Sequence, residues 1–291
     1  MATESPQTWF ITGCSSGFGE GFVRQLRAAG DNVIATGRNA ETKLAHLKDT
    51  GAVIMDLDVT EPLAEIAEKA KEAWSVFGGV DIVVNNAGAI ISGALEELTQ
   101  EELETGIKTN FYGPLNVTKA FLPYLRERGS GTLLYIGSIA GWQGNPGAIS
   151  YTSPKFAIAG AVECLAKELA VVAPAIKLLL VEPGYFHTAA FTKLYHVPPR
   201  LPAYAEFNAA SAAFEERVNG HQPGDVEKGV QRMIELAKGT GMAEGKTLPL
   251  RVPLGSDAVA GFRAKCEEGL KTCREWEEMA KSTDKSTGLR A

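Results

Sequence analysis

The sequence predicts an α/β fold: a doubly wound parallel sheet of about seven strands, built as a single domain over residues 1–291. Two patterns lead to this prediction. Short apolar runs alternate with amphipathic segments of helical length, which is the order of repeated strand–helix–strand units. The apolar runs are continuous, as expected of strands whose two faces are both covered by helices.

The first elements are a strand, a glycine-rich turn and a helix. Residues 9–11 form an apolar run, and Phe22, Val23 and Leu26 give the next segment a helical apolar stripe that closes at Gly30. A second apolar run at 32–36 completes a βαβ unit with parallel strands.

The later elements continue this alternation. Further strands are expected at 52–55, 81–85, 132–136, 177–182 and, last, 246–250. Helices are expected at about 62–77, 99–126, 151–172 and 226–238, the second with a capping box between Thr99 and Glu102 and a kink at Gly113-Pro114. A proline- and aromatic-rich segment at about 185–220 predicts a small helical lobe, and Ser256 is expected to cap a C-terminal helix at about 256–280.

Composition limits the classes of function. Hydrophobic residues make up 45% and charged residues 22%, as in a soluble globular protein with a sizeable core. The net charge of −6, with no basic block, gives nucleic-acid binding little electrostatic support. No apolar run approaches the roughly 20 residues that a membrane span needs, and the polar N-terminus lacks the features of a secretory signal. We therefore expect a cytoplasmic protein with no membrane span.

The cysteines and histidines show no metal-ligand spacing. None of Cys14, Cys164, Cys266 and Cys273 belongs to a CxxC pair. Cys266 and Cys273 stand seven residues apart on a predicted helix, which is too far for a disulfide between them. We expect reduced cysteines and no metal site.

The glycine-rich turn has the spacing Gly13-x3-Gly17-x-Gly19. Backbone N–H groups and the helix dipole at such a turn favour a phosphate, and glycines let the backbone approach a pyrophosphate closely. Ser15 and Ser16 can add hydroxyl donors. A tight turn with left-handed backbone would also explain glycines, but three of them with two serines favour a dinucleotide site.

The end of the second strand bears on the choice of dinucleotide. Folds that prefer NAD usually carry an acidic residue there, which holds the ribose hydroxyls. Here the strand ends Thr36-Gly37-Arg38, with no acid. Arg38 would instead meet a 2′-phosphate, and the alternative is an ordinary surface arginine; the missing acid favours NADP. Asp58 either bonds an adenine amino group or serves the start of the next helix.

Tyr151 and Lys155 stand four residues apart on a predicted helix, so their Cβ atoms lie about 6 Å apart. A phenol has a pKa of about 10, and a fixed ammonium nearby lowers it. The tyrosine could then act as a general acid or base near neutral pH. Such pairs also occur on ordinary solvated helix faces, so the spacing alone does not decide.

These residues together resemble the short-chain dehydrogenase/reductase family over about residues 8–188. The matching motifs are Thr12-Gly13-x3-Gly17-x-Gly19, Asp58-Val59, Asn85-Asn86-Ala87-Gly88, Asn110, Gly137-Ser138, Tyr151-x3-Lys155 and Pro183-Gly184-x3-Thr188. Ser138 precedes Tyr151 by 13 residues, as the family pattern requires. The stretch ending in Arg38 resembles NADP-preferring members, and the glycine-rich turn and Leu254-Gly-Ser-Asp257 resemble the steroid- and retinol-dehydrogenase subgroup.

The resemblance implies a Rossmann-type fold and an NADP(H)-dependent oxidoreductase, a carbonyl reductase or alcohol dehydrogenase, that interconverts a carbonyl and a secondary alcohol by hydride transfer. It implies that Tyr151 is the acid/base, Lys155 lowers the pKa of Tyr151 and holds the nicotinamide ribose, Ser138 bonds the substrate oxygen, and Asn110 holds a water that links Lys155 to solvent. Lowering a tyrosine pKa by about 3 units needs about 4 kcal/mol. We expect the nicotinamide charge and partial burial to help one exposed ammonium supply it.

The resemblance also implies the binding residues. For the cofactor they are Gly13, Ser15, Ser16, Gly17, Phe18, Gly19, Arg38, Asp58, Val59, Asn86, Ala87, Gly88, Tyr151, Lys155, Pro183, Gly184 and Thr188. Aromatic residues predict a bulky apolar small-molecule substrate, bound between Ser138–Tyr151, the segment 141–144 and the lobe at 185–220. The residues expected to bind it are Ser138, Trp142, Tyr185, Phe186 and Phe191, and about half of the aromatics are expected to form the core of the lobe itself.

Some alternatives stay open at this point. The chain could be a non-catalytic NADP-binding regulator, or could catalyse a non-redox reaction on a natural product. The family suggests a homo-oligomer, a dimer or tetramer, formed through helices near 105–126 and 151–172, unless the C-terminal helix covers that surface. Pro154 stands where the family usually has a small residue, and it would cost a hydrogen bond if the helix began well before Tyr151.

Overall fold

The computed structural model describes residues 5–188 and 193–285. Seven parallel strands form one sheet in the order β3-β2-β1-β4-β6-β7-β9. Their bounds are β1 Thr8–Ile11, β2 Asn32–Gly37, β3 Val53–Asp56, β4 Ile82–Asn85, β6 Gly131–Ile136, β7 Ile176–Pro183 and β9 Arg251–Leu254. The predicted α/β doubly wound fold with a seven-stranded parallel sheet is confirmed.

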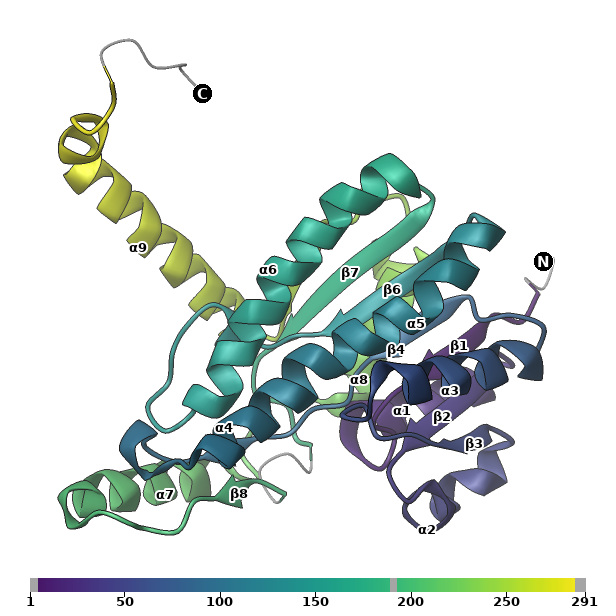
Figure 1. Ribbon diagram of the computed structural model, residues 1–291, viewed down its shortest axis with the longest axis horizontal. Helices are drawn as coiled ribbons and strands as arrows, with labels where there is room; N and C mark the ends of the chain where they lie inside the picture. The colour runs from purple at the N-terminus through teal and green to yellow at the C-terminus, as the bar shows by residue number, and fades with distance from the viewer. Residues whose placement is uncertain (1–4, 189–192, 286–291) are drawn as a thin grey trace.

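Helices cover both faces of this sheet (Figure 1). One face packs on α1 (Gly17–Ala28) and α8 (Val226–Lys238), and the other on α3 (Leu63–Val76), α5 (Gly113–Arg128) and α6 (Ile149–Val172). The residues of β1 show how each strand serves both cores: Trp9 packs with Phe22 of α1, whereas Phe10 packs with Phe121 of α5, their ring centroids 4.6 Å apart. This arrangement explains why the strands are apolar on both faces.

The strand order reverses between β1 and β4, which are neighbours in the sheet. In doubly wound folds the crevice beyond the carboxyl ends of the strands at this point is where ligands bind. The glycine-rich turn after β1 and the loop after β4 therefore meet there. A second, two-stranded sheet, β5 (Ile91–Ser92) and β8 (Tyr195–His196), ties the lobe to the loop after β4.

The helix expected to run from Thr99 past Gly113-Pro114 is three consecutive segments. The capping box of Thr99 and Glu102 starts α4 (Gln100–Ile107) as predicted. A single π-turn, Lys108–Tyr112, then joins α4 to α5. The irregularity therefore lies just before Gly113, and Pro114 falls in the first turn of α5, where its missing N–H costs little.

Two predictions at the C-terminal end were wrong. The last strand is Arg251–Leu254, not 246–250, because its backbone pairs with Leu180–Pro183 of β7. The final helix α9 (Ser256–Lys281) is preceded by Gly255 at the N-cap, and Ser256 is its first residue and makes no capping bond. Inside the lobe, α7 (Ala205–Val218) supplies the expected helical character.

Candidate active site

The glycine-rich turn is built from contacts that leave no room for side chains. Gly13 and Gly17 have left-handed backbone, with φ of +72° and +62°. A Cβ on Gly13 would stand 2.8 Å from the Cα of Ala87, and one on Gly19 would stand 2.3 Å from the Gly13 carbonyl oxygen. The third glycine therefore lets the start of α1 pack on the turn itself.

Two polar side chains fasten this turn to the loop after β4. The Asn86 amide donates to the carbonyl oxygens of Thr12 and Gly13, at 2.8 and 3.0 Å. In return, the Thr12 hydroxyl accepts from the backbone N–H groups of Asn86 and Ala87, both at 3.0 Å. The walls of the crevice are thus held in register by the residues of the motif.

A cavity of about 1390 Å³ extends from this turn to the lobe. It is lined by every predicted cofactor residue except Gly19, namely Gly13, Ser15, Ser16, Gly17, Phe18, Arg38, Asp58, Val59, Asn86, Ala87, Gly88, Tyr151, Lys155, Pro183, Gly184 and Thr188. Gly19 lies behind the lining because it packs on the turn. The turn lines the cavity at the start of α1, where backbone N–H groups and the helix N-terminus can bind a phosphate, so the residues present fit a dinucleotide.

One end of the cavity carries positive charge. The Arg38 side chain is 65% exposed, and its Nη1 lies 3.9 Å from Oδ2 of Asp58. Asp58 also accepts from the backbone and hydroxyl of Thr60, at 2.9 and 2.8 Å, so it organises its own loop as well as lining the cavity. Lys43, the last residue of α2 (Ala40–Lys43), lines the same cavity. The sequence reasoning missed Lys43, which no motif marks.

Ser138, Tyr151 and Lys155 come together on the cavity wall. Ser138 follows β6, and its hydroxyl accepts from the Ala140 N–H at 3.1 Å and makes a hydrogen bond with the Tyr151 side chain. Lys155 lies on the same side of α6 as Tyr151, with its Nζ 5.4 Å from the tyrosine ring centroid. That ammonium donates to the Ile136 carbonyl oxygen at 2.8 Å. The predicted spacing thus produces the predicted cluster.

The electrostatics of this cluster correct one expectation. Burial raises the pKa of the Tyr151 phenol, and the Ser138 hydrogen bond lowers it only in part. The expected help from partial burial is therefore wrong in sign. Lys155 is also not an exposed ammonium: it is 7% exposed, and burial lowers its pKa to about 8 against the opposing charge of Glu182.

Asn110 is buried in the π-turn between α4 and α5. Its amide nitrogen donates to the carbonyl oxygens of Ala89 and Gly106, at 2.8 and 3.0 Å, and its amide oxygen accepts from the Ala89 N–H at 3.2 Å. Both donors of the side chain are thus bonded to backbone. Asn110 holds the loop after β4 against α4, and it does not line the cavity.

Pro154 is the sixth residue of α6, because the helix begins at Ile149, two residues before Tyr151. It therefore leaves the Ser150 carbonyl without the N–H that another residue would donate. Gly106 of α4 lies against this carbonyl, where a Cβ on Gly106 would come within 2.3 Å of the oxygen. The hydrogen bond that Pro154 removes is therefore lost where α4 packs closely on α6. The proline does not separate Tyr151 from Lys155, which still lie together on the cavity wall.

The lobe end of the cavity is aromatic, although not as predicted throughout. Tyr185 and Phe186 line it, together with Phe207 and Phe214 of α7. Trp142 does not: its ring packs against Phe262 and under the Arg251 guanidinium, and its Nε1 donates to Glu182 at 2.7 Å. The assignment of Trp142 to the substrate is therefore withdrawn. Phe191 lies outside the described residues.

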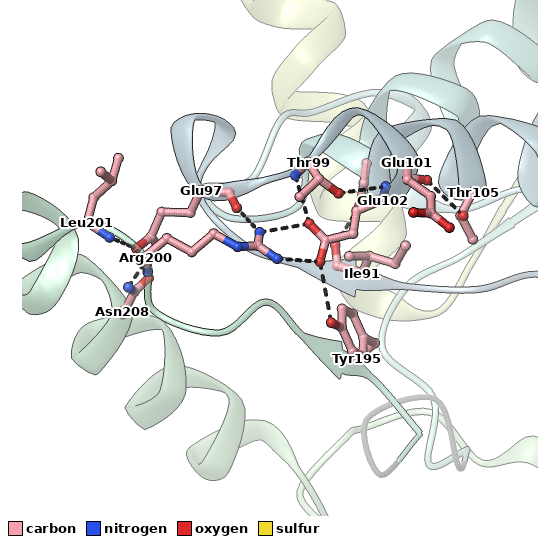
Figure 2. Close-up of polar contacts among 11 residues, drawn as sticks. Ile91, Glu97, Thr99, Glu101, Glu102, Thr105, Tyr195, Arg200, Leu201 and Asn208 are labelled. Carbon is pink, nitrogen blue, oxygen red and sulfur yellow. Dashed lines mark hydrogen bonds and ion pairs between the residues drawn. The ribbon is translucent and has the colours of Figure 1, made fainter.

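A buried carboxylate holds the lobe to the segment before α4, as Figure 2 shows. Glu97 is 2% exposed and accepts from the backbone of Arg200 and Leu201 and from the Asn208 amide, at 2.8, 3.0 and 2.9 Å. The Arg200 guanidinium makes two bonds of 2.9 Å with Glu102 and a further one with the Glu97 carbonyl. The Arg200 side chain holds the pKa of Glu102 at about 2. No sequence signal indicated this cluster.

A lobe lysine reaches the glycine-rich turn. The Lys193 ammonium donates to the Ser16 hydroxyl at 2.8 Å, and both residues line the cavity. Lys193 was also missed, because its partner lies 177 positions away. It brings a positive charge to the glycine-rich turn, in addition to Arg38 and Lys43 elsewhere on the cavity.

The described ranges 5–188 and 193–285 contain no group of three or more His, Cys, Asp or Glu that could hold a metal ion. No helix in this part of the chain is both long and apolar enough to cross a bilayer. Cys14, Cys164, Cys266 and Cys273 are all free, and burial raises the pKa of the Cys14 thiol to about 12.

Comparison with known proteins agrees with this geometry. The family model described as short chain dehydrogenase matches residues 7–197. Oxidoreductase BOA17 of Botryotinia fuckeliana is 32% identical over 276 residues, covering 94% of this chain and 97% of that protein. The 3-ketodihydrosphingosine reductase of Bacteroides thetaiotaomicron is 37% identical over 183 residues, 63% of this chain and 65% of that one. A short-chain dehydrogenase structure from Streptomyces avermitilis superposes with a TM-score of 0.83 at 34% identity, covering 98% of this chain and 100% of that one. The chain is therefore an oxidoreductase of the short-chain dehydrogenase/reductase family.

Proposed function

We propose that this chain is an NADP(H)-dependent oxidoreductase that interconverts a carbonyl and a secondary alcohol on a bulky, largely apolar small molecule. The observation that carries the proposal is the convergence of Ser138, Tyr151 and Lys155 on one cavity that begins at the glycine-rich turn. A regulator that only bound the dinucleotide would have no need of this cluster.

The cofactor, when bound, supplies or accepts the hydride. Tyr151 gives its proton to the carbonyl oxygen in reduction and takes it back in oxidation. Its raised pKa keeps the phenol protonated at neutral pH, which is the state that reduction requires. Ser138, already bonded to the tyrosine, orients the substrate oxygen. The Lys155 ammonium is held in place by its hydrogen bond to the Ile136 carbonyl oxygen. Its pKa of about 8 lets it exchange a proton near neutral pH.

The preference for NADP rests on charge. Arg38 directly follows β2, at the position where an acidic residue would favour NAD. Lys43 adds a second cation to the lining of the same cavity. A 2′-phosphate would gain charge-assisted bonds that a ribose hydroxyl would not.

Asn110 would hold the loop after β4 in place through its hydrogen bonds to Ala89. We also propose that it holds a water that links Lys155 to solvent, as the family resemblance implies.

The substrate preference rests on the lobe. Tyr185, Phe186, Phe207 and Phe214 give this end of the cavity an aromatic wall. The similar protein from Bacteroides thetaiotaomicron is named as a reductase of a keto compound, which supports a carbonyl substrate for this chain. We also propose that the chain belongs to the steroid- and retinol-dehydrogenase subgroup. A cytoplasmic location is proposed as well, because free cysteines are typical of a reducing compartment.

The test is turnover of NADPH against a panel of bulky ketones and aldehydes. Tyr151→Phe should lower kcat by about 10³-fold, because it removes the acid, while NADPH still binds. Tyr124→Phe is the matched control: Tyr124 stacks on Trp74 away from the cavity and should leave turnover unchanged. Full activity in Tyr151→Phe would refute the assigned chemistry. Tight NADPH binding without turnover of any compound would favour the regulator.

A further inference from the structure

Helix α9 leaves the body of the domain (Figure 1). Its first turns are anchored, with the Phe262 ring 4.3 Å from that of Trp142. From residue 263 to 281 every side chain is exposed. This stretch is about 28 Å long, and helices in proteins take most of their stability from packing an apolar face, which this stretch does not do within the chain. Three ion pairs along the helix, such as Lys271–Glu275, stabilise it only slightly.

Helix α9 carries a heptad pattern that begins at the anchored Phe262 and continues along its exposed part. Residues at alternating spacings of three and four form one seam: Phe262, Cys266, Gly269, Cys273, Trp276 and Ala280. Trp276 is 57% exposed, and beside the seam Leu270 and Met279 are 58% and 66% exposed. Large exposed apolar groups in such a register are typical of a helix that packs on another helix.

We propose that α9 pairs antiparallel with α9 of a second copy of this chain, about a two-fold axis at the level of residue 271. In this register the seam is complementary in size. Trp276 faces Cys266 of the second copy, and Gly269 faces Cys273. Each large residue meets a small one, and the smallest pair lies at the centre.

One flank of the seam is complementary in charge in the same register. On this flank, which meets one residue before the level of the seam layers, Arg263 faces Glu277 of the second copy, and the two-fold axis repeats this pair at the other end of the helices. Leu270 faces its own copy across the axis. A symmetric contact of this kind is isologous and closes on two copies.

A parallel pairing lacks both kinds of complementarity. It would stack Trp276 on Trp276 and Gly269 on Gly269, which crowds one layer and leaves a gap at the other. The flanking positions would then bring Lys265 to Leu270 and Thr272 to Glu277, with no opposite-charge pair. The charge pattern therefore favours the antiparallel arrangement.

The test is a charge-reversal cycle on the full chain, read as copy number by sedimentation. Arg263→Glu or Glu277→Arg alone places like charges opposite each other at two positions, and should weaken association by at least about 10-fold. The double variant faces Glu with Arg again and should restore it. Glu278→Arg, on the outer face of the helix, is the matched control and should change nothing.

A second variant measures the seam. Trp276→Glu should halve the copy number, whatever other contact the chain makes, while far-ultraviolet circular dichroism reports whether α9 stays helical. Equal copy numbers for wild type and Trp276→Glu would overturn the proposal. So would a double charge variant that associates no better than the single ones. Neither readout uses turnover, so the result is independent of the proposed function.

Discussion

The two walls of the cavity are built differently. The cofactor wall, formed by the turn after β1 and the loop after β4, is held by backbone contacts too close for a Cβ and by bonds to the buried Thr12. The lobe wall relies more on side chains: besides the short β5–β8 backbone pairing, Glu97 and Arg200 make most of its attachments, and α7 has no buried residue. A rigid wall suits a cofactor that never varies, whereas side-chain contacts can change with the substrate.

This difference predicts how mutations should act. A change in the cofactor wall has no way to relax, because backbone atoms block it. A change in the lobe wall removes one of several polar contacts and leaves the others in place, which costs less. The largest effects are therefore expected at the turn and the smallest at the lobe.

Gly19→Ala should have the largest effect. Its Cβ would stand 2.3 Å from the Gly13 carbonyl oxygen and 2.7 Å from the Asn86 amide nitrogen, so the start of α1 must shift. We expect NADPH to bind at least about 100-fold more weakly, which is about 3 kcal/mol. Titration by fluorescence or calorimetry measures it.

Gly160→Ala is the matched control for this variant. It lies in α6 with no atom within 4 Å of the added Cβ, so it should be neutral or stabilising by up to about 1 kcal/mol. Similar NADPH affinities in Gly19→Ala and the wild type would show that the turn is softer than its contacts indicate.

The next largest effect concerns Lys155 and pH. Its folded-state pKa of about 8 lies below the ordinary 10.5 of the unfolded chain, so its burial costs stability below pH 8 and this cost disappears as the pH rises towards 10.5. Relative to Lys155→Met, the free energy of unfolding of the wild type should rise by up to about 3 kcal/mol over this pH range. Denaturant unfolding at pH 7 and pH 9.5, without cofactor, measures the difference.

The exposed Lys119→Met provides the comparison, because α5 holds Lys119 away from the cavity. Its stability difference from wild type should not change with pH. A constant difference for Lys155→Met as well would mean that the folded chain hydrates Lys155 better than its 7% exposure indicates.

The sequence predicts the features that local backbone geometry requires, and it does not predict the side-chain contacts between distant segments. The turn, the strands β1 to β4, β6 and β7, and the Ser138–Tyr151–Lys155 cluster were predictable, because a fixed backbone and a helical spacing each require particular residues at particular intervals. The last strand was misplaced because Arg251 and Pro253 make Arg251–Leu254 look unlike a strand; Arg251 is stabilised there by the buried Glu182. Lys193 and Glu97 act through partners more than 100 positions away, which no local pattern reveals.

Arg38→Ala should have an intermediate effect, since the Arg38 side chain is 65% exposed. Loss of a charge-assisted bond to a 2′-phosphate should weaken NADPH by about 10- to 100-fold and NADH much less. Arg126→Ala, at the exposed end of α5, is the control and should change neither. Equal losses for both dinucleotides would remove Arg38 from the phosphate site.

The smallest effect is expected from Glu97→Gln in the lobe wall. The carboxylate accepts three bonds, from the Arg200 and Leu201 N–H groups and from Asn208, and these hold the pKa of Glu97 below its ordinary value. An amide offers one acceptor oxygen and turns a donor towards the other groups, so at least one bond is lost. We expect the KM for the carbonyl substrate to rise about 3- to 10-fold, while the dissociation constant for NADPH stays unchanged.

Glu206→Gln, exposed on α7, tests whether any carboxylate of the lobe would do the same, and it should leave KM unchanged. Because the pKa of Glu97 is lowered on folding, its bonds are fully present above pH 4.5 and are lost only as the pH falls further, so the KM of the wild type should show no Glu97-dependent change between pH 7 and pH 5. If Glu97→Gln instead weakens NADPH as much as it raises KM, the two walls are not independent. The link between them would then be the bond from Lys193 to Ser16, which joins the lobe to the turn.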